Sequence, residues 1–233
     1  MNRWAIFNFR KTNRSGGQRS EAPRFEAMEF IVNRLNAKEK YQLLTSCIVP
    51  RPIAWVTTVS QKGIYNAAPF SYFTGVSIEP PFILFAVERR HGNKKDTVVN
   101  IEQTKEFVVN VVTSSNVQQM NLTSKDFHED EDEFEMASLK PIPSKVVKPP
   151  SIKESPVHLE CKLDQIIEIG SSPHSLVIGE VVVVTVDDEL VIDGRIQMDR
   201  LKAVGRMGGK WYTKTDQRFE LPRLDWRKTE IEK

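Results

Sequence analysis

RPIAWVTTV, from Arg51 to Val59, is the first of four segments that together decide the fold. NAAPFSYF (Asn66–Phe73), FILFAV (Phe82–Val87) and RRHGNKKDT (Arg89–Thr97) follow it in order. β-Branched and aromatic residues dominate the first and third segments, which favours strands. The polar sequence SQKG, Ser60 to Gly63, predicts a hairpin between the first two segments. We therefore expect the core to begin as adjacent β-strands.

The fourth segment predicts an anion site at the start of a helix. Asp96 or Thr97 is a candidate N-cap ahead of an apolar-periodic run. The first turn of such a helix presents unpaired N–H groups and the positive end of the helix dipole. The preceding basic residues, Arg89 and Lys95 among them, add full positive charges. Phosphate is the commonest ligand that combines these features, and a solvated basic loop is the open alternative.

The rest of the chain has mainly strand-like patterns. Phe82–Val87 and Phe107–Val112 are near-continuous apolar runs, which predicts central strands buried on both faces. Two longer strands, Val157–Ile169 and Leu176–Val186, are expected around the connection Gly170–His174. Alternating strands with few helices favour an antiparallel barrel. Helices are expected over Ala37–Leu44, about Asp96–Gln103, and Ser115–Leu122.

Composition and charge exclude several classes of function. The 233 residues are 39% hydrophobic and 27% charged, which allows one sizeable core. A net charge of +2 is too small to indicate a nucleic-acid partner, and apolar runs such as Val181–Val184 are too short to cross a membrane. Cys47 and Cys161 form no CxxC pair, so we expect no metal site and a cytoplasmic location, with one disulfide between them as an open alternative.

Two segments differ in charge from the rest. Asp126–Glu135, with the sequence DFHEDEDEFE, is interpreted as a solvated loop rather than a metal site, because clustered carboxylates repel one another. Residues 1–27 hold six basic residues against Glu21 and Glu26. They predict a disordered tail or an extension upstream of a start at Met28, with organelle targeting as the less favoured alternative. Residues 28–233 are expected to form a single domain.

The motifs PRPIAWVT, NAAPFSYF, PPFI, KDT and EFVVNVV, in this order, carry a family resemblance. Over about Ala37–Leu221 the chain resembles the flavin reductase-like family of FMN-binding split barrels, which includes flavoredoxin-type proteins and reductase components of two-component monooxygenases. The resemblance implies a mainly β fold, an FMN-binding split β-barrel with antiparallel, Greek-key-like strands and a few peripheral helices. It also implies FMN as cofactor and NADH or NADPH as hydride donor.

The implied activity is that of an NAD(P)H:flavin reductase. A flavoredoxin-type electron carrier and a non-redox binding module on the same fold remain alternatives. The sequence has no GxGxxG or GxxxxGKS/T motif, so a nicotinamide nucleotide would lie directly on the flavin. We expect no catalytic acid, base or nucleophile, because the cofactor carries the chemistry and the protein supplies position and electrostatics.

The resemblance also implies which residues touch the flavin. The segment matching Asn66–Phe73 runs along the isoalloxazine ring in the family, and small side chains at Ala67 and Ala68 would let the backbone approach it. Alternation places Trp55 and Thr57 on one strand face, with Thr57 expected near the phosphate or ribityl chain. Without the resemblance, the alanines and Trp55 are explained equally well as packing residues. The expected cofactor-binding set is Arg51, Trp55, Thr57, Asn66, Ala67, Ala68, Ser71, Arg89, Lys95, Asp96, Thr97, Arg206 and Tyr212.

The expected partners follow from the same argument. Besides flavin and nicotinamide nucleotide, an oxygenase or an electron-transfer protein is a candidate partner. The strands Phe82–Val87 and Phe107–Val112 are apolar on both faces, which is more apolar surface than the interior of one small barrel can bury. This pattern predicts a homodimer whose interface closes the flavin site. Arg206 and Tyr212, within VGRMGGKWY, would face the flavin or that second copy, or form an exposed turn with a packing aromatic.

Overall fold

The computed structural model describes residues 27–222, and the chain divides into two compact units, Met1–Leu43 and Leu44–Lys233. In the first unit a short 3-10 helix, η1 (Val32–Arg34), precedes α1 (Ala37–Cys47), which continues into the second unit. Asn36 and Glu39 exchange side-chain to backbone hydrogen bonds of 3.0 and 2.8 Å at the start of α1. In this capping box the two side chains accept hydrogen bonds from backbone N–H groups that have no partner within the helix, which explains why the helix begins there. The expected tail, residues 1–27, lies outside the described residues except for Ala27.

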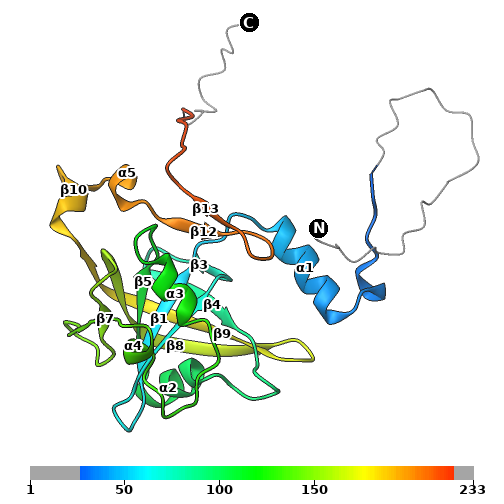
Figure 1. Ribbon diagram of the computed structural model, residues 1–233, viewed down its shortest axis with the longest axis horizontal. Helices are drawn as coiled ribbons and strands as arrows, with labels where there is room; N and C mark the ends of the chain where they lie inside the picture. The colour runs from blue at the N-terminus through cyan, green and yellow to red at the C-terminus, as the bar shows by residue number, and fades with distance from the viewer. Residues whose placement is uncertain (1–26, 223–233) are drawn as a thin grey trace, which may run out of the picture. The chain divides into compact units, whose positions relative to one another are not determined.

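The second unit is built on a seven-stranded antiparallel sheet (Figure 1). The strand order is β2-β1-β5-β8-β9-β4-β3. The two edge strands are consecutive in sequence, since β2 ends at Phe70 and β3 begins at Phe73. One stretch of chain therefore forms both edges, and the sheet curls into the barrel that the sequence predicted. The strand bounds are β1 Ala54–Val59, β2 Tyr65–Phe70, β3 Phe73–Gly75, β4 Phe82–Val87, β5 Glu106–Val111, β8 Val157–Ile169 and β9 His174–Val186.

Short elements surround this sheet. Three two-stranded ladders pair β6 (Pro141–Ile142) with β7 (Ser151–Ile152), β10 (Val191–Ile192) with β11 (Arg195–Ile196), and β12 (Val204–Arg206) with β13 (Tyr212–Lys214). The helices are α2 (Asp96–Thr104), α3 (Val117–Leu122), α4 (Glu133–Met136), α5 (Met198–Leu201) and the 3-10 turn η2 (Asp188–Leu190). Among residues 27–222 no helix is long and apolar enough to cross a membrane.

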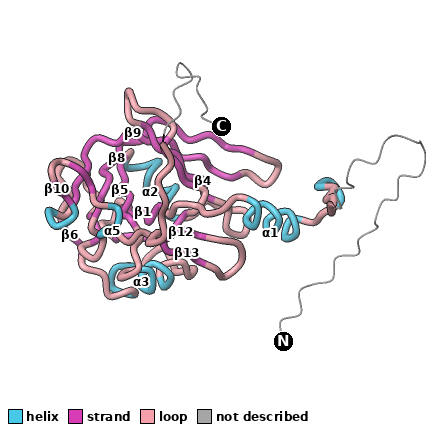
Figure 2. Tube along the Cα trace, turned by 90° about the horizontal axis from the view of Figure 1, so that it is seen from above, coloured by secondary structure: helices cyan, strands magenta, loops and turns pink. Residues whose placement is uncertain are grey.

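Side chains alternate between two cores. Ala54 and Val56 of β1 face the barrel interior, where Val98 and Ile101 of α2 join them; Figure 2 draws β1 in magenta and α2 in cyan. Trp55 faces the opposite side, into a second cluster with residues of α3, α4 and the β6–β7 segment. This outer cover explains why β1 and β5 are buried on both faces.

Two expectations about the strands and helices need correction. β4 is not buried on both faces: its residues alternate between buried and half-buried, because only Ile83, Phe85 and Val87 point into the barrel. β5 is buried on both faces, but by other parts of the same chain, so it leaves no apolar face for a second copy. The homodimer therefore stays a prediction. The N-cap of α2 is Lys95 rather than Asp96 or Thr97, which both lie within the helix.

Candidate functional site

One group of the expected site residues lies around Arg51. The side chain is buried, and its guanidinium donates to the carbonyl oxygens of Thr45 and Ile48 at 2.7 Å and of Met207 at 3.2 Å. Its Nε also donates to Ser71 Oγ at 3.3 Å. Arg51 thus joins the end of α1 to the start of the segment between β2 and β3, and most of its donors already have protein acceptors.

Arg206 and Tyr212 belong to the same group. The backbones of Arg51 and Arg206 pair, with N–H···O distances of 2.9 and 2.8 Å. The Arg206 guanidinium lies over the Tyr212 ring, 4.5 Å from its centroid, and donates to the carbonyl oxygen of Gly209 at 2.7 Å. The structure therefore brings Arg51, Ser71, Arg206 and Tyr212 together at the end of β2.

Three other expected residues are interior packing residues. Trp55, Thr57 and Ala67 have no exposed surface. Trp55 Nε1 donates to Thr123 Oγ1 at 2.9 Å, and Thr57 Oγ1 donates to the carbonyl oxygen of Pro150 at 2.6 Å. Their polar atoms are satisfied by protein, so a direct flavin contact does not fit Trp55 or Thr57. The alternation of side chains along the strand correctly predicted that Trp55 and Thr57 share one face of β1, but other segments of the chain pack on that face. Ala68 is half-buried against the barrel core.

The basic loop is folded by a tight turn. Arg90 and Asn93 exchange backbone hydrogen bonds of 2.8 Å, and the two residues between them, His91 and Gly92, have φ angles of 48° and 84°. Two positive φ values in a two-residue turn are typical of type I′, which Gly accommodates freely and His tolerates better than most residues. Because the chain reverses here, Arg89 lies opposite Lys94.

Arg89 and Lys94 share one carboxylate. Glu168 of β8 lies 2.8 Å from Arg89 and 3.9 Å from Lys94, and Lys94 also pairs with Glu102. Burial acts to raise the pKa of Glu168, but the hydrogen bond from Ser175 and the neighbouring cations outweigh it, so the pKa is lowered. The two cations and the two carboxylates of Glu168 and Glu102 thus form one ion-pair network close to the start of α2.

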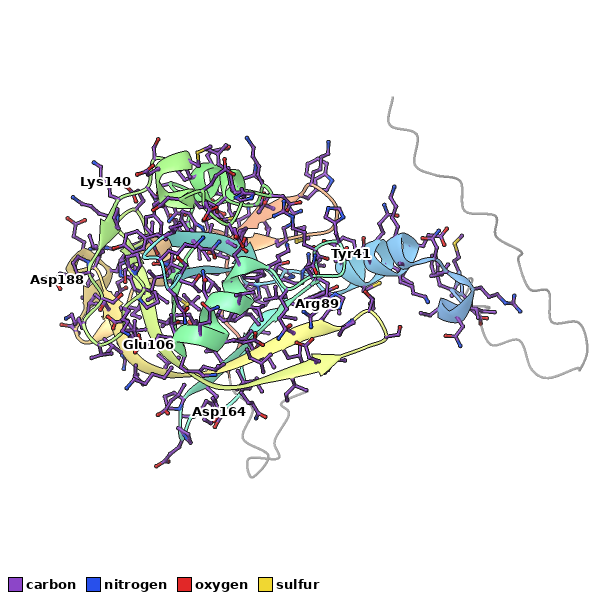
Figure 3. The ribbon with its side chains drawn as sticks, turned by 90° about the horizontal axis from the view of Figure 1, so that it is seen from below. Tyr41, Arg89, Glu106, Lys140, Asp164 and Asp188 are labelled. Carbon is purple, nitrogen blue, oxygen red and sulfur yellow. The ribbon has the colours of Figure 1, made fainter. Side chains whose placement is uncertain are left out.

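The residues at this point fit a phosphate group. Arg89 is labelled in Figure 3. Its side chain is 15% exposed, and its Nε is buried without a hydrogen-bond acceptor in the described part of the chain. The N–H groups of Val98 and Val99 bond to the carbonyl oxygen of Lys95, whereas the N–H groups of Asp96 and Thr97 occupy first-turn positions that have no intrahelical acceptor. Lys95 is 3.8 Å from Glu88. An arginine N–H and helix-terminal amides are the donors that a phosphate monoester accepts.

A buried polar network connects this helix to β2. Asn66 Oδ1 accepts from Thr97 Oγ1 at 2.9 Å and from Thr58 Oγ1 at 3.2 Å. Asn66 Nδ2 donates to Glu133 Oε1 at 2.7 Å, and Asn100 Nδ2 donates to Thr58 Oγ1 at 3.0 Å. Thr97 and Asn66, both expected flavin contacts, are therefore buried, and their side chains bond to protein.

Glu133 is the residue that sequence reasoning missed. The acidic block is not a solvated loop throughout: Asp132 caps α4 by accepting from the N–H groups of Phe134 and Glu135, and Glu133 and Phe134 are buried. Burial raises the pKa of Glu133 to about 7, with the hydrogen bond from Asn66 opposing the shift. The signal in the sequence was Phe134, one of two phenylalanines inside the acidic run and the one next to Glu133.

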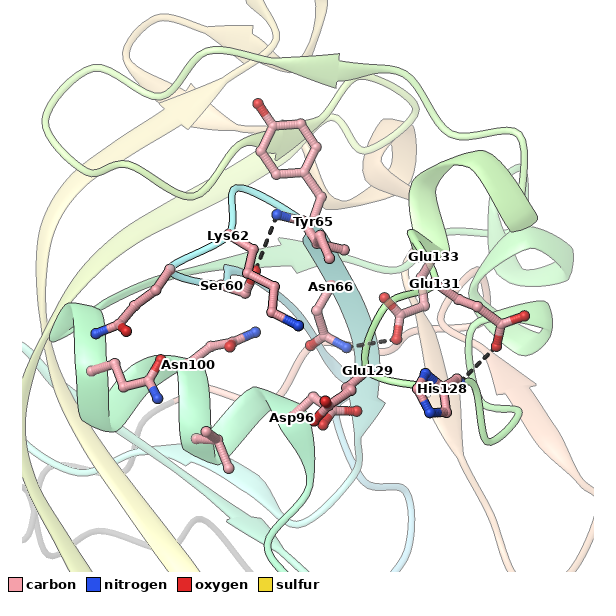
Figure 4. Close-up of a pocket in the computed structure, with 14 residues that line it drawn as sticks. Ser60, Lys62, Tyr65, Asn66, Asp96, Asn100, His128, Glu129, Glu131 and Glu133 are labelled. Carbon is pink, nitrogen blue, oxygen red and sulfur yellow. Dashed lines mark hydrogen bonds between the residues drawn. The ribbon is translucent and has the colours of Figure 1, made fainter.

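The side chain of Glu133 lines a pocket of about 180 Å³, shown in Figure 4. We call this the acidic pocket, because its lining includes four carboxyl groups, those of Asp96, Glu129, Glu131 and Glu133. The side chain of Asp96 therefore faces the acidic pocket, so a phosphate at the start of α2 would meet its backbone N–H and not its carboxylate. Within residues 27–222 no three His, Cys, Asp or Glu side chains are grouped so that they could hold a metal ion.

Comparisons with known proteins agree with this architecture. Residues 45–200 match the family model of the flavin reductase like domain. The structure of nitrilotriacetate monooxygenase component B from Bacillus cereus is 38% identical, with a TM-score of 0.79 over 89% of this chain and 100% of that one. The 2-nitrobenzoate 2-nitroreductase of Pseudomonas fluorescens is 34% identical, with a TM-score of 0.79 over 85% and 98%.

A third structure, from Shewanella frigidimarina and with a split barrel domain, is 27% identical, with a TM-score of 0.73 over 83% of this chain and 96% of that one. The family model covers well over half of the 233 residues, and the relatives align along nearly their whole length. The curled antiparallel sheet with β2 and β3 at its two edges agrees with the split barrel domain of this third structure. The chain belongs to the flavin reductase-like family and has its split-barrel fold.

Proposed function

We propose that this protein is an NAD(P)H-dependent FMN reductase. The observation that carries the proposal is the basic segment before α2: Arg89, whose Nε has no acceptor within the described residues, and Lys95 precede the first-turn N–H groups of Asp96 and Thr97, which have no intrahelical acceptor. Membership of the flavin reductase-like family supports a flavin as the ligand, and the donors at this point favour one that carries a phosphate. FMN is the flavin that ends in a single phosphate group.

The chain's own residues would bind and orient the cofactor. Arg89, Lys95 and the N–H groups of Asp96 and Thr97 would hold the phosphate, and the backbone of β2 would present N–H and C=O groups to the ring. A strand rises about 3.3 Å per residue, so Asn66 and the Ser71 end of this segment lie roughly 16 Å apart. The two groups of expected site residues would thus contact the two ends of an extended ligand.

The bound flavin would accept the hydride, and the protein would position the flavin and provide its electrostatic surroundings. Hydride transfer to the flavin requires no acid or base from the protein. The covered face of β1 contributes by fixing β2, which pairs with it along its whole length. Orientation of this kind supplies up to roughly 7–11 kcal/mol of a barrier.

The phosphate assignment is tested by Arg89→Met, which keeps the alkyl stem and removes the guanidinium. Loss of a charge-assisted hydrogen bond, about 1.5–3 kcal/mol, should weaken FMN binding roughly tenfold to a hundredfold. Riboflavin, which lacks the phosphate, should bind with unchanged affinity. Arg195→Met on the exposed strand β11 is the matched control. Fluorescence titrations that show equal losses for FMN and riboflavin would refute the assignment.

The reductase activity is tested by anaerobic stopped-flow mixing of the FMN-loaded protein with NADH or NADPH. We expect loss of flavin absorbance without any other protein. If the flavin stays oxidised with both nucleotides and is reduced by a ferredoxin-like donor, the protein is a flavoredoxin-type electron carrier instead.

The relatives support two fates for the reduced flavin. Similarity to nitrilotriacetate monooxygenase component B supports a partner oxygenase that consumes it. Similarity to 2-nitrobenzoate 2-nitroreductase supports a second candidate function, in which a small acceptor is reduced at the same site. Gel filtration after reduction distinguishes the two candidate functions, since only transfer to a partner oxygenase requires FMN to leave the protein.

Cys47 is an exposed free thiol and Cys161 a buried one, which supports a reducing, cytoplasmic location.

A further inference from the structure

The guanidinium of Arg51 is a buried positive charge that no carboxylate neutralises. The residue is 4% exposed, and none of the ion pairs formed by the described residues includes it. Arg89, Arg90 and Arg218 differ in this respect, since each lies beside a carboxylate. A guanidinium carries a full positive charge, and burial limits how far water and salt screen it. The charge of Arg51 therefore acts on whatever group lies next to it.

Neutral groups hold this guanidinium in place. It donates to the carbonyl oxygens of Thr45 and Ile48 at 2.7 Å, at and just after the last turn of α1, and to that of Met207 at 3.2 Å. The last carbonyl groups of a helix have no intrahelical donor and form the negative end of its dipole. The end of α1 thus stabilises the charge without cancelling it. Because separate segments bind one planar group, its position is fixed.

The remaining contact of the guanidinium makes Ser71 a hydrogen-bond donor. Arg51 Nε donates to Ser71 Oγ at 3.3 Å, and an arginine cannot accept in return. The hydroxyl proton of Ser71 is therefore available to another group, and it has no acceptor among residues 27–222. Ser71 is only partly buried, so a ligand can reach it. Four of the five N–H groups of Arg51 have protein acceptors, so Arg51 acts on a ligand through Ser71 and through its charge.

We propose that Arg51 is a positioning residue of the flavin site, which holds Ser71 as a donor to the isoalloxazine ring and stabilises the charge that the ring gains on reduction. The inference rests on the proposed function, which puts the phosphate at α2 and hence the ring at the Ser71 end of β2. Hydride transfer moves two electrons and one proton from the nicotinamide to the flavin. The nicotinamide ring becomes a cation, and the neutral flavin ring becomes an anion until a further proton arrives. A buried positive charge beside the ring favours that anion over the oxidised ring.

The alternative is a purely structural role, in which Arg51 only joins the end of α1 to Met207. The two roles predict different effects on binding. Loss of a structural contact weakens oxidised and reduced FMN equally, whereas loss of a charge beside the ring weakens the reduced form more. The ratio of the two dissociation constants sets the reduction potential of the bound flavin, and a tenfold change in that ratio corresponds to about 30 mV for a two-electron couple.

Two measurements on the full-length protein test the proposal. Titration gives the dissociation constant of oxidised FMN, and anaerobic equilibration with dithionite and a redox dye gives the reduction potential of the bound flavin. Arg51→Met should weaken reduced FMN roughly tenfold more than oxidised FMN, which is a shift of about 30 mV to a more negative potential. Arg51→Lys keeps the charge and loses the planar group, so both forms should bind more weakly at a nearly unchanged ratio. Arg195→Met on the exposed strand β11 is the matched control and should change neither value.

Ser71→Ala tests the contact with the ring. It removes one hydrogen-bond donor and leaves the charge of Arg51 in place. Because FMN and riboflavin share the ring, both should bind more weakly by the same factor of roughly three to ten. Arg89→Met, in contrast, should weaken FMN alone.

Equal weakening of oxidised and reduced FMN by Arg51→Met would overturn the charge role, and unchanged riboflavin binding to Ser71→Ala would overturn the ring contact. If Arg51→Met does not fold, Arg51→Gln, which is neutral but keeps N–H donors, takes its place with the same two outcomes. Failure of the proposed function has a different signature. A wild-type protein that binds no FMN overturns both proposals, whereas a bound flavin that only dithionite reduces overturns the NAD(P)H-dependent activity alone.

Discussion

Glu133→Gln should remove a pH-dependent loss of stability. The pKa of Glu133 is raised from 4.5 to about 7, mainly by burial, and the charges of Asp96 and Asp132 act in the same direction. Each pKa unit corresponds to about 1.4 kcal/mol, so ionising Glu133 costs the folded state about 3 kcal/mol at high pH. Glutamine keeps the shape and can still accept from Asn66 Nδ2 through its amide oxygen.

The sign follows from proton binding. Between pH 4.5 and 7 the folded state holds a proton on Glu133 that the unfolded state has released, so stability falls as pH rises through this range. Below pH 4.5 both states are protonated and the cost disappears. From pH 5 to pH 8 the wild-type protein should lose roughly 2–3 kcal/mol relative to Glu133→Gln. For a domain of this size that is a difference in Tm of roughly 4–12 °C.

Thermal melts of both proteins at half-unit pH steps measure this difference directly. All other titratable groups are common to both proteins and cancel in the comparison. Glu135→Gln removes a charge from the exposed side of α4 and should run parallel to the wild type. If the wild type and Glu133→Gln keep a constant separation from pH 5 to pH 8, Glu133 does not ionise at a cost and the reasoning is refuted.

Two further predictions concern packing and assembly. In Gly179→Ala the new Cβ would clash with Cζ of Phe107, so the free energy of unfolding measured in urea should fall by about 1–3 kcal/mol. Gly75→Ala is the control, because nothing lies near its new Cβ, and its free energy of unfolding should be within about 0.5 kcal/mol of wild type. Equal effects of the two substitutions would show that the barrel relaxes around Phe107. A chain starting at Met28 should remain dimeric and bind FMN, because exposed apolar residues such as Ile78, 93% exposed, are available to an interface; light scattering that shows a flavin-loaded monomer would contradict the shared interface.

Local patterns were sufficient to predict the long strands of the sheet and the position of α2, although not its N-cap. The β-branched run of β1, the turn at Ser60–Gly63 and the apolar periodicity of α2 each depend on residues close in sequence. Burial on both faces could not be predicted in the same way. Trp55 and Thr57 are covered by Thr123, Pro150 and their neighbours, which lie about 70 and 90 residues further along the chain. A single sequence does not show which distant loop packs on a given strand.

Patterns of charged residues led to wrong predictions where individual carboxyl side chains turn away from solvent. A run of carboxylates normally indicates a solvated segment, yet α4 turns Glu133 inward while Glu135 stays exposed. Asp96 was expected to support an anion at a helix start, but its side chain faces the acidic pocket and the N-cap position belongs to Lys95. Only the three-dimensional arrangement separates the two sides of this helix start, one basic and one acidic.

Asn66 is the residue that keeps those two sides apart. Its amide oxygen holds the Thr97 hydroxyl and its amide nitrogen holds Glu133, so both side chains are fixed by one planar group. Because the Thr97 hydroxyl is committed to Asn66, a phosphate at α2 would be recognised by backbone N–H groups and by Arg89. A change at Asn66 would therefore release the side chains of Thr97 and Glu133 together.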